Sequence, residues 1–466
     1  NWIWPRHTGD FSMFRVYASK DNRPAAYSPQ NVPYRPKKHF SISTKGVKEG
    51  DFTMIYGFPG NTQEYILSDA VAYIAERSDP AKIAVRTGRL DIITKAQESD
   101  PALRIHYAAK HASIANAWKK WQGEALGIDR RGTVAAKFDY ETQFGLWSVG
   151  RPEYAGVVMG LRAEYDRIMD AYFAYEITRE TLSTLPAAYT PEERSEECFA
   201  RRKFAEQALW RHAFREYGRC PKVYRTPSYA EGMARYKSPE AYADALFEAV
   251  WEGSDSVAMQ PAVRLREETK RMLDHISWML GTKSLRNLNS KILNELYTTY
   301  IKGLREWDRE RAFYPDANLT LRVAYGSVAG YEYADGEYHK PQTTLDGIIA
   351  KDNPEIYDYD IPQSLRDLYA SKNYGRWGTV IDGRRTVPVC FLATNHTTGG
   401  NSGSPVLNAG GELIGINFDR TWRSTMSDIA FDPAICRNIA VDIRYVLFVV
   451  DRVGGAGYLL KEMTLK

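Results

Sequence analysis

Residues 399–405 read GGNSGSP, and this short polar turn lies between two segments that are typical of strands. The segment before it, residues 387–394 (VPVCFLAT), is almost wholly apolar. The segment after it, residues 412–418 (ELIGINF), is rich in apolar and β-branched residues. A buried strand, a tight turn and a second strand predict a β-sheet region that presents the turn at its edge.

The turn has the composition that a serine nucleophile requires. Such a serine exposes its Oγ on a tight turn, with backbone N–H groups directed at the developing oxyanion. Gly400 and Gly403 flank Ser402, and their bare backbone lets a substrate carbonyl approach closely. We predict an oxyanion hole from the amides of Gly400 and Ser402. The motif alone is also compatible with an ordinary Gly/Ser β-turn, but the flanking strands and Pro405 favour catalysis.

Three zones of different periodicity follow one another along the 466 residues. The first, to about residue 67, has alternating segments at 11–17 and 51–56, which predict strands. The second, about 68–312, has apolar residues at helical spacing, with patterns at 154–177, 200–214, 241–251, 263–280 and 292–307. The third, from about 313, returns to short strand patterns at 319–325, 387–394, 412–418 and 438–443, before a helical pattern at 444–460. Strands, helices and strands again predict a β domain with a helical insertion.

Composition excludes several classes of function. The formal net charge of +4 over the whole chain is too small to indicate nucleic-acid binding. No apolar run is long enough to span a membrane. The four cysteines, which contain no CxxC spacing, predict neither a zinc site nor a disulfide scaffold, although their pairing stays open. His106 and His111 are five residues apart and would not face each other as metal ligands. We therefore predict no metal and no cofactor.

Three longer motifs together resemble the bacterial dipeptidyl peptidases 7 and 11, a family of chymotrypsin-like serine exopeptidases. They are residues 1–12 (NWIWPRHTGDFS), residues 314–318 (YPDAN) with 321–323 (LRV), and the serine turn followed by residues 418–420 (FDR). The resemblance implies a mainly β, chymotrypsin-like double β-barrel with a large α-helical insertion domain. It divides the chain into the C-terminal part of a first, only partly present barrel (1–67), a helical cap (68–312), and a second barrel with a C-terminal helix (313–466).

The same resemblance assigns catalytic roles. Ser402 matches the nucleophile and Asp10 the aspartate of a Ser-His-Asp triad, which would orient the histidine. The family's histidine precedes that aspartate in the first barrel, and no histidine of this chain matches it. We interpret His7 and His396, which lie near the motifs in sequence, as structural. The chain begins Asn1-Trp2 without Met or signal peptide. We therefore expect it to start within a folded region, to lack the triad histidine, and to be inactive by itself.

Substrate recognition is implied in the same way. An enzyme that releases dipeptides must bind a free α-ammonium at a set distance from its nucleophile, and the family's positions for this match Asn1, Trp2, Asn116 and Asp419. Arg420 matches an arginine of the Asp/Glu-specific dipeptidyl peptidase 11 type. A guanidinium can donate two parallel hydrogen bonds to a carboxylate. Arg420 is thus predicted to select an acidic residue at P1, the position before the cut.

The leading hypothesis is therefore a serine exopeptidase that releases N-terminal dipeptides with Asp or Glu at the second position. Two alternatives stay open: a broad or hydrophobic-specific dipeptidyl peptidase of the same family, and a non-catalytic peptide-binding module. The expected partners are peptides with a free N-terminus, with no nucleic acid and no membrane span, and a homodimer is left open. The family resemblance implies the periplasm or cell envelope of a bacterium.

Overall fold

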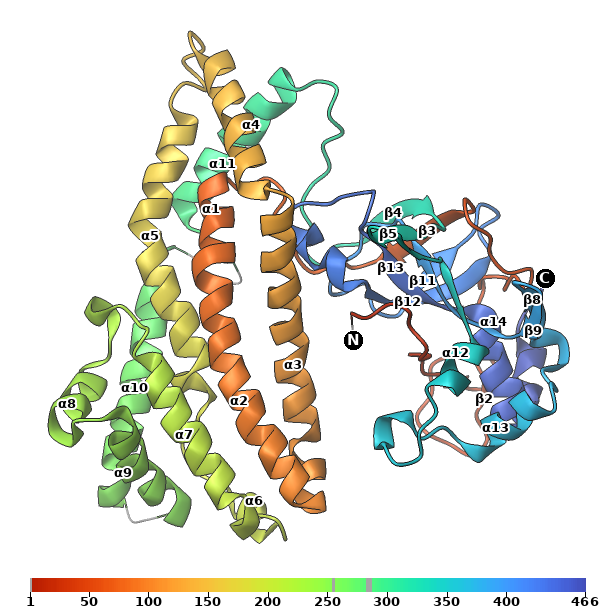
Figure 1. The fold of residues 1–466 in the computed structure, drawn as a ribbon, viewed down its shortest axis with the longest axis horizontal. Helices are drawn as coiled ribbons and strands as arrows, with labels where there is room; N and C mark the ends of the chain where they lie inside the picture. The colour runs from red at the N-terminus through yellow and green to blue at the C-terminus, as the bar shows by residue number, and fades with distance from the viewer. Residues whose placement is uncertain (1, 254–255, 282–286) are drawn as a thin grey trace. The chain divides into compact units, whose positions relative to one another are not determined.

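The computed structural model describes residues 2–253, 256–281 and 287–466 (Figure 1). The chain divides into two compact units. A sheet unit comprises Asn1–Glu64 and Pro315–Lys466, and a helical unit comprises Tyr65–Tyr314. The chain thus leaves the sheet unit once, forms all of the helical unit, and returns.

The sheet unit is built on seven antiparallel strands in the order β4-β3-β11-β12-β13-β10-β7. Their bounds are β3 (Phe52–Gly57), β4 (Arg322–Ser327), β7 (Gln342–Thr344), β10 (Pro388–Ala393), β11 (Ser404–Leu407), β12 (Leu413–Arg420) and β13 (Asn438–Asp442). Three two-stranded ribbons accompany them: β1 (Tyr17–Ala18) with β2 (Val32–Pro33), β5 (Tyr331–Ala334) with β6 (Glu337–His339), and β8 (Thr379–Ile381) with β9 (Arg384–Thr386). The helices are α12 (Leu345–Ala350), α13 (Gln363–Ala370) and α14 (Ile443–Phe448).

Strands β10 and β13 form the centre of this unit, because every residue in both is buried. Val389 and Val441 pack in one apolar cluster that includes Phe448 of α14, whereas Phe391 and Ala440 pack in a second. A strand covered on both faces has a continuous apolar run instead of alternation, which is the pattern of residues 387–394. The serine turn therefore follows the most deeply buried strand of the unit.

The helical unit contains the longest elements of the chain. Its helices are α1 (Ser68–Ala72), α2 (Asp79–Ser99), α3 (Pro101–Arg130), α4 (Thr133–Ser148), α5 (Val157–Glu180), α6 (Pro191–Ser195), α7 (Lys203–Tyr217), α8 (Pro227–Tyr236), α9 (Pro239–Glu252), α10 (Ser256–Met279) and α11 (Lys291–Trp307). Helix α5 is central: half of its residues are buried and it packs against α2, α7, α10 and α11. The predicted helices at 154–177, 200–214, 241–251, 263–280 and 292–307 are confirmed. No described helix is long and apolar enough to cross a bilayer.

The expected fold class is wrong. The chain is about 52% helical, and its described residues contain one open seven-stranded sheet and no closed barrel. Strand β3, which the family resemblance assigned to a separate first barrel, pairs with β11 and β4 of the C-terminal region. Alternation predicts that a strand exists, but its partners are chosen by contacts between distant segments.

The strand predicted at 11–17 is also wrong for most of its length. Only Tyr17 and Ala18 pair, with Pro33 and Val32 of β2. Phe14 and Val16 are largely exposed, so the alternating residues of this segment do not form one face of a sheet. The predicted strands at 51–56, 387–394, 412–418 and 438–443 are confirmed as β3, β10, β12 and β13.

Candidate active site

Ser402 lies on the turn between β10 and β11, and its side chain is exposed. The glycines on either side have left-handed backbones, with φ of 105° at Gly400 and 81° at Gly403. A Cβ at Gly400 would also lie 2.3 Å from the carbonyl oxygen of Phe58. Only glycine fits both the backbone angle and this close approach, so the residue type that suggested an oxyanion hole is also required by the turn.

A buried amide network holds the turn from below. The Asn401 side-chain oxygen accepts a hydrogen bond from the Thr398 N–H (3.1 Å). The Asn401 backbone carbonyl accepts a hydrogen bond from the Asn417 side-chain amide (3.1 Å). The Gly403 N–H donates to the Asn417 carbonyl at 2.8 Å, and Asn438 of β13 donates to the Asn417 amide oxygen at 2.9 Å. Because these groups belong to the turn and to its neighbouring strands, the network fixes the backbone that carries Ser402.

The Ser402 hydroxyl itself is held only weakly. Its Oγ donates to the Phe418 carbonyl at 3.5 Å, the outer limit for a hydrogen bond. This contact places the hydroxyl beside the end of β12, immediately before Asp419 and Arg420. The exposed nucleophile candidate and the two predicted binding residues therefore belong to one local site.

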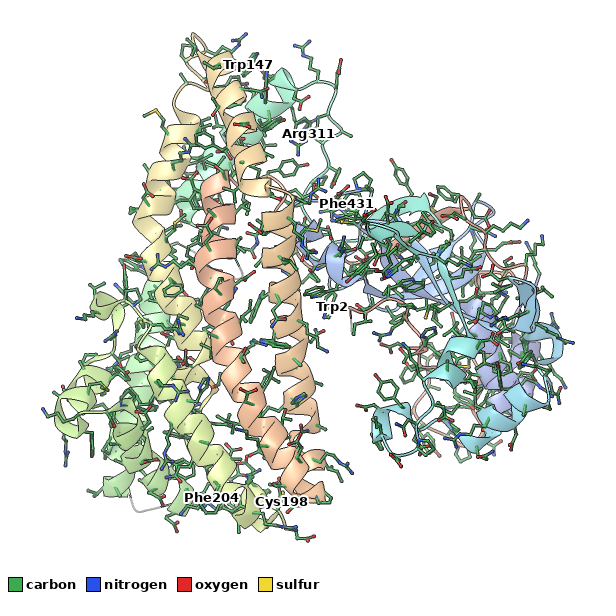
Figure 2. All side chains as sticks on the ribbon, viewed as in Figure 1. Trp2, Trp147, Cys198, Phe204, Arg311 and Phe431 are labelled. Atoms are coloured by element: carbon green, nitrogen blue, oxygen red, sulfur yellow. The ribbon has the colours of Figure 1, made fainter. Side chains whose placement is uncertain are left out.

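Asp419 accepts N–H donors from the N-terminal segment. Its Oδ2 lies 3.1 Å from the Trp2 backbone nitrogen and 3.3 Å from Nη1 of Arg6. Its Oδ1 accepts the Arg420 N–H at 2.8 Å. The Trp2 ring stands 5.5 Å from the Arg420 guanidinium. Trp2 (Figure 2), which precedes Asp419 and Arg420 by more than 400 residues in the sequence, thus contacts both of them.

Arg420 is almost completely buried and is paired with Asp428. Its Nη1 and Nη2 donate to the two Asp428 carboxylate oxygens at 2.6 and 2.9 Å. Nη1 also lies 2.9 Å from Ser427 Oγ and 3.2 Å from the Thr397 carbonyl. Burial alone would lower the pKa of Arg420, but Asp428 raises it above its ordinary value. The Arg420 Nε has no hydrogen-bond partner among the described residues, so one donor of the fork is available.

His396 contacts the residue next to Asp428. Its Nε2 lies 2.9 Å from the Ser427 carbonyl, and its Nδ1 lies 3.2 Å from the Glu64 carboxylate. The ring stacks on Phe431 with centroids 4.5 Å apart. Burial lowers the pKa of His396. Both ring nitrogens have partners other than Ser402, which is the arrangement of a structural histidine and not of a general base.

His7 and Asp10 lie in the N-terminal segment, and neither forms a hydrogen bond or an ion pair with Ser402 among the described residues. Burial, assisted by the charge of Lys351, lowers the pKa of His7 to about 4, so the ring is neutral at pH 7. The Asp10 carboxylate is exposed and makes no hydrogen bond with any described residue. Asn116 is an exposed residue of α3 in the helical unit, and Asn1 lies outside the described residues. The roles of these four residues therefore stay predictions.

Comparison with known proteins identifies the family. The chain matches peptidase S46 over residues 1–197 and 199–465. It belongs to the peptidase S46 family. The match includes both units, so the helical insertion is part of this S46 chain and not an unrelated domain.

Curated S46 relatives are dipeptidyl peptidases. The chain is 40% identical to an "Asp/Glu-specific dipeptidyl-peptidase" of Capnocytophaga gingivalis and 33% identical to "dipeptidyl-peptidase 7" of Phocaeicola vulgatus. Each match covers 100% of this chain and 70% of the relative. Among solved structures, Porphyromonas endodontalis DPP11 in complex with the dipeptide Arg-Glu superposes with a TM-score of 0.82 at 32% identity, covering 100% of this chain and 72% of that one. The chain is therefore an S46 peptidase.

Sequence reasoning missed the residues that surround Arg420. Two segments that no motif marked supply these residues: Thr397 comes from the first, and Ser427 and Asp428 come from the second. A 3₁₀ turn at Trp422–Asp428 returns the chain to the end of β12, so that Ser427 and Asp428 contact Arg420. The one available signal was the acidic residue eight positions after Arg420, which a charge-pairing search over short loops would have found. The sequence left the pairing of the four cysteines open, and in the structure none of the four forms a disulfide.

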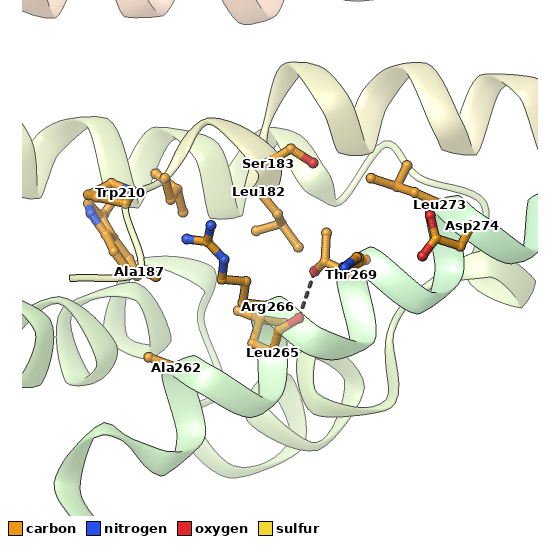
Figure 3. Close-up of a pocket in the computed structure, with 13 residues that line it drawn as sticks. Leu182, Ser183, Ala187, Trp210, Ala262, Leu265, Arg266, Thr269, Leu273 and Asp274 are labelled. Atoms are coloured by element: carbon orange, nitrogen blue, oxygen red, sulfur yellow. Dashed lines mark hydrogen bonds between the residues drawn. The ribbon is translucent and has the colours of Figure 1, made fainter. Parts of the chain in front are cut away.

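The helical unit also contains a cavity of about 250 Å³ between α7, α10 and the residues that follow α5 (Figure 3). Its floor is apolar and includes Leu182, Trp210 and Leu265. The Arg266 side chain reaches over this floor (Figure 3). None of the predicted site residues lines the cavity, so it is separate from the serine turn.

Proposed function

We propose that this S46 peptidase is a serine dipeptidyl peptidase that releases N-terminal dipeptides and prefers Asp or Glu at P1. One observation carries the proposal: the exposed Ser402 hydroxyl contacts the backbone of Phe418, directly before Asp419 and Arg420. A nucleophile, an acceptor for an ammonium group and a cation for a carboxylate are thus next to one another. The names of the curated relatives support the same assignment.

In this proposal Ser402 Oγ attacks the second peptide carbonyl of the substrate while a histidine takes its proton. The Gly400 and Ser402 amides donate to the oxyanion. The peptide C–N bond then breaks, the histidinium protonates the leaving amine, and the dipeptide stays on Oγ as an ester. Water, deprotonated by the same histidine, hydrolyses the ester and frees the dipeptide. Both ring nitrogens of His396 contact other groups, and His7 forms no hydrogen bond with Ser402 among the described residues. The proposal therefore takes this histidine, and its pairing with Asp10, from the family resemblance.

Asp419 would bind the substrate α-ammonium. Its carboxylate already accepts a backbone N–H and a guanidinium N–H, so it is oriented toward donors. Trp2 lies against it, and the resemblance adds Asn1 and Asn116. A fixed ammonium site at this distance from Ser402 makes the second peptide bond the one that reaches the nucleophile.

Arg420 would select the acidic side chain through its unpartnered Nε. A buried donor without an acceptor costs about 1–3 kcal/mol, and a substrate carboxylate would remove this cost whereas an apolar P1 side chain would not. Asp428 partly neutralises the guanidinium, which favours the second candidate, a dipeptidyl peptidase of broad P1 preference. The two candidates differ in whether acidic substrates are preferred.

The remaining features of the proposal follow the resemblance. They are a helical unit that limits access to free N-termini and a location in the periplasm or cell envelope, whereas the choice between a monomer and a homodimer stays open.

The test uses the whole protein as its gene encodes it, because no histidine of this chain matches the triad histidine that the proposal requires. The substrates are dipeptidyl fluorogenic compounds that end in Asp, Glu, Leu or Lys. We expect the highest kcat/KM on Asp and Glu, and no release from the N-acetylated forms. Ser402→Ala should lower kcat by several orders of magnitude, because triad members act as a unit.

Ser404→Ala is the matched control, since it removes a buried hydroxyl two residues away and should leave most of the activity. Loss of activity in Ser404→Ala but not in Ser402→Ala would refute the assignment of the nucleophile. Equal rates on Asp, Glu and Leu would favour the broad candidate, and equal cleavage of acetylated substrates would exclude an exopeptidase.

A further inference from the structure

The cavity of the helical unit has an apolar floor beside a row of charged side chains, and both belong to one face of α10. The α10 residues that line the cavity recur at intervals of three and four, which places them on one side of the helix. The apolar part of this face consists of Ala262, Leu265 and Leu273. The charged row, in which each residue follows the previous one by four positions, consists of Arg266, Lys270 and Asp274.

Segments that are distant in sequence complete the floor. Leu182 of the turn after α5 and Trp210 of α7 are 7% and 3% exposed, and Leu265 is 5% exposed. Thr269 also lines the cavity, but its hydroxyl already donates to the Leu265 carbonyl at 2.7 Å (Figure 3). The floor is therefore predominantly apolar, and its surface suits a hydrocarbon group.

The two cations of the charged row have no acidic partner in the part of the chain that the structure describes. Arg264, on the same helix, forms ion pairs with Glu231 at 2.9 Å and Glu268 at 2.8 Å. No ion pair or hydrogen bond joins the side chain of Arg266 or Lys270 to another described residue. The Arg266 side chain instead extends across the apolar floor (Figure 3). A negatively charged group of a ligand would supply the missing partner.

The charges of this row select a monoanion. Two cations and the carboxylate of Asp274 leave a net charge of +1 at the edge of the cavity. Asp274 lies about 12 Å from Arg266 along the helix axis, so it disfavours an anion only at its own end. A carboxylate can accept two parallel hydrogen bonds from a guanidinium. We propose that the cavity binds a small apolar monocarboxylate, with its hydrocarbon part on the floor and its carboxylate against Arg266 and Lys270.

The volume sets the size of this ligand. An apolar cavity of about 150 Å³ holds one molecule of benzene. At the same packing, the volume of about 250 Å³ holds about ten non-hydrogen atoms, which is the size of octanoate. The carboxyl end of a peptide would instead place an amide on the apolar floor, where a polar group without a partner costs free energy. A fatty acid of medium chain length therefore fits the cavity better than a peptide terminus.

Binding would join three segments of the helical unit. The ligand would contact α10, α7 and the turn that follows α5. A ligand that binds only the folded protein stabilises it in proportion to the logarithm of its concentration above Kd. The melting temperature should therefore rise with the concentration of octanoate.

Isothermal titration calorimetry of the protein with sodium octanoate measures the binding. We expect saturable binding with a Kd in the millimolar range or below, which is the strength that about ten ligand atoms commonly provide. Octanol has the same chain without the charge and should bind at least about tenfold more weakly. Octylamine, whose charge has the wrong sign for Arg266 and Lys270, should show no saturable binding. N-acetyl-leucine represents a peptide terminus and should bind at least about tenfold more weakly than octanoate.

Substitutions on α10 then test the individual residues. Arg266→Gln should weaken octanoate binding at least about tenfold, because hydrogen bonds from a charged group are lost. Arg271→Gln is the matched control, since it removes an exposed cation of the same helix that does not line the cavity. Asp274→Asn removes the anion of the charged row and should bind octanoate at least as tightly as the wild type. Ala262→Leu fills part of the floor and should weaken binding. Circular dichroism checks that each variant is folded.

The proposal is overturned if the wild-type protein shows no saturable binding of octanoate, or if octylamine binds as tightly as octanoate does. A folded Arg266→Gln variant with unchanged affinity would also overturn it. Tighter binding of N-acetyl-leucine than of octanoate would assign the cavity to peptide termini and would refute the hydrocarbon ligand. These measurements do not depend on peptidase activity, because none of the predicted site residues lines the cavity.

Discussion

Removing Arg420 is expected to have two separable effects, one on substrate preference and one on stability. In the wild-type protein the guanidinium is paired with Asp428, and the two side chains are only 5% and 12% exposed. Arg420→Met removes the cation and leaves a buried carboxylate without its partner. Arg420→Met combined with Asp428→Asn removes both charges and keeps a polar side chain at position 428.

The structure sets the magnitudes. Truncating one partner of a buried, hydrogen-bonded charge pair with a ligand costs about 2–5 kcal/mol. At about 1.4 kcal/mol per tenfold, kcat/KM on Asp and Glu substrates should fall about thirtyfold to several thousandfold. Removing the guanidinium partner of the buried Asp428 carboxylate should destabilise the sheet unit by about 3–5 kcal/mol. Replacing both charges should restore most of that stability, because an isolated buried charge is then absent.

Two assays separate the effects. Dipeptidyl substrates ending in Asp, Glu and Leu report preference, and hydrogen exchange of peptides from β12 and β13 reports local stability. The single variant should lose both the acidic preference and the protection of these strands. The double variant should regain protection but not preference, and Leu substrates should be cleaved at about the wild-type rate.

The reasoning fails if the single variant still prefers Asp and Glu, since the acidic pocket would then be built from other residues. It also fails if the double variant regains both protection and acidic preference. In that case Arg420 acts only by holding Asp428 and the turn that follows β12.

Three further predictions concern the turn, the ammonium site and pH. Gly400→Ala should lower kcat at least about a hundredfold, because the added Cβ would lie 2.3 Å from a backbone carbonyl oxygen. Gly399→Ala is the control, since a Cβ at Gly399 has no atom within 4 Å. Equal activity of the two variants would contradict the geometry. Asp419→Asn should raise KM about 10- to 150-fold, the value of a hydrogen bond to a charged group of about 1.5–3 kcal/mol; an unchanged KM on free dipeptidyl substrates would remove Asp419 from the ammonium site. Burial and Lys351 lower the pKa of His7 from 6.5 to about 4. The unfolded chain therefore binds this proton more readily than the folded protein, and the free energy of unfolding should decrease as the pH falls from 6.5 toward 4. The difference between the urea midpoints at pH 7 and pH 4.5 should be smaller in His7→Gln than in the wild type, and an identical difference would show that His7 is not the cause.

Several features were within reach of sequence reasoning because they depend on neighbouring residues. The strands β3, β10, β12 and β13 and five helices of the helical unit were predicted from periodicity, which records which faces of an element are buried. The glycines around Ser402 could be identified from the sequence because they permit a tight turn. Trp2, Asp419 and Arg420 were brought into one site only through the family resemblance.

The sequence by itself determined the local elements, the serine turn and the helical insertion. The tertiary structure alone decided that β3 joins β11 and β4 in one open sheet, that Asp428 pairs with Arg420, and that Arg266 and Trp210 line one cavity. The reason is physical. Periodicity and turn chemistry depend on residues a few positions apart. Strand partners and buried charge pairs are selected by the free energy of bringing distant segments together, which cannot be read from any one segment of the sequence.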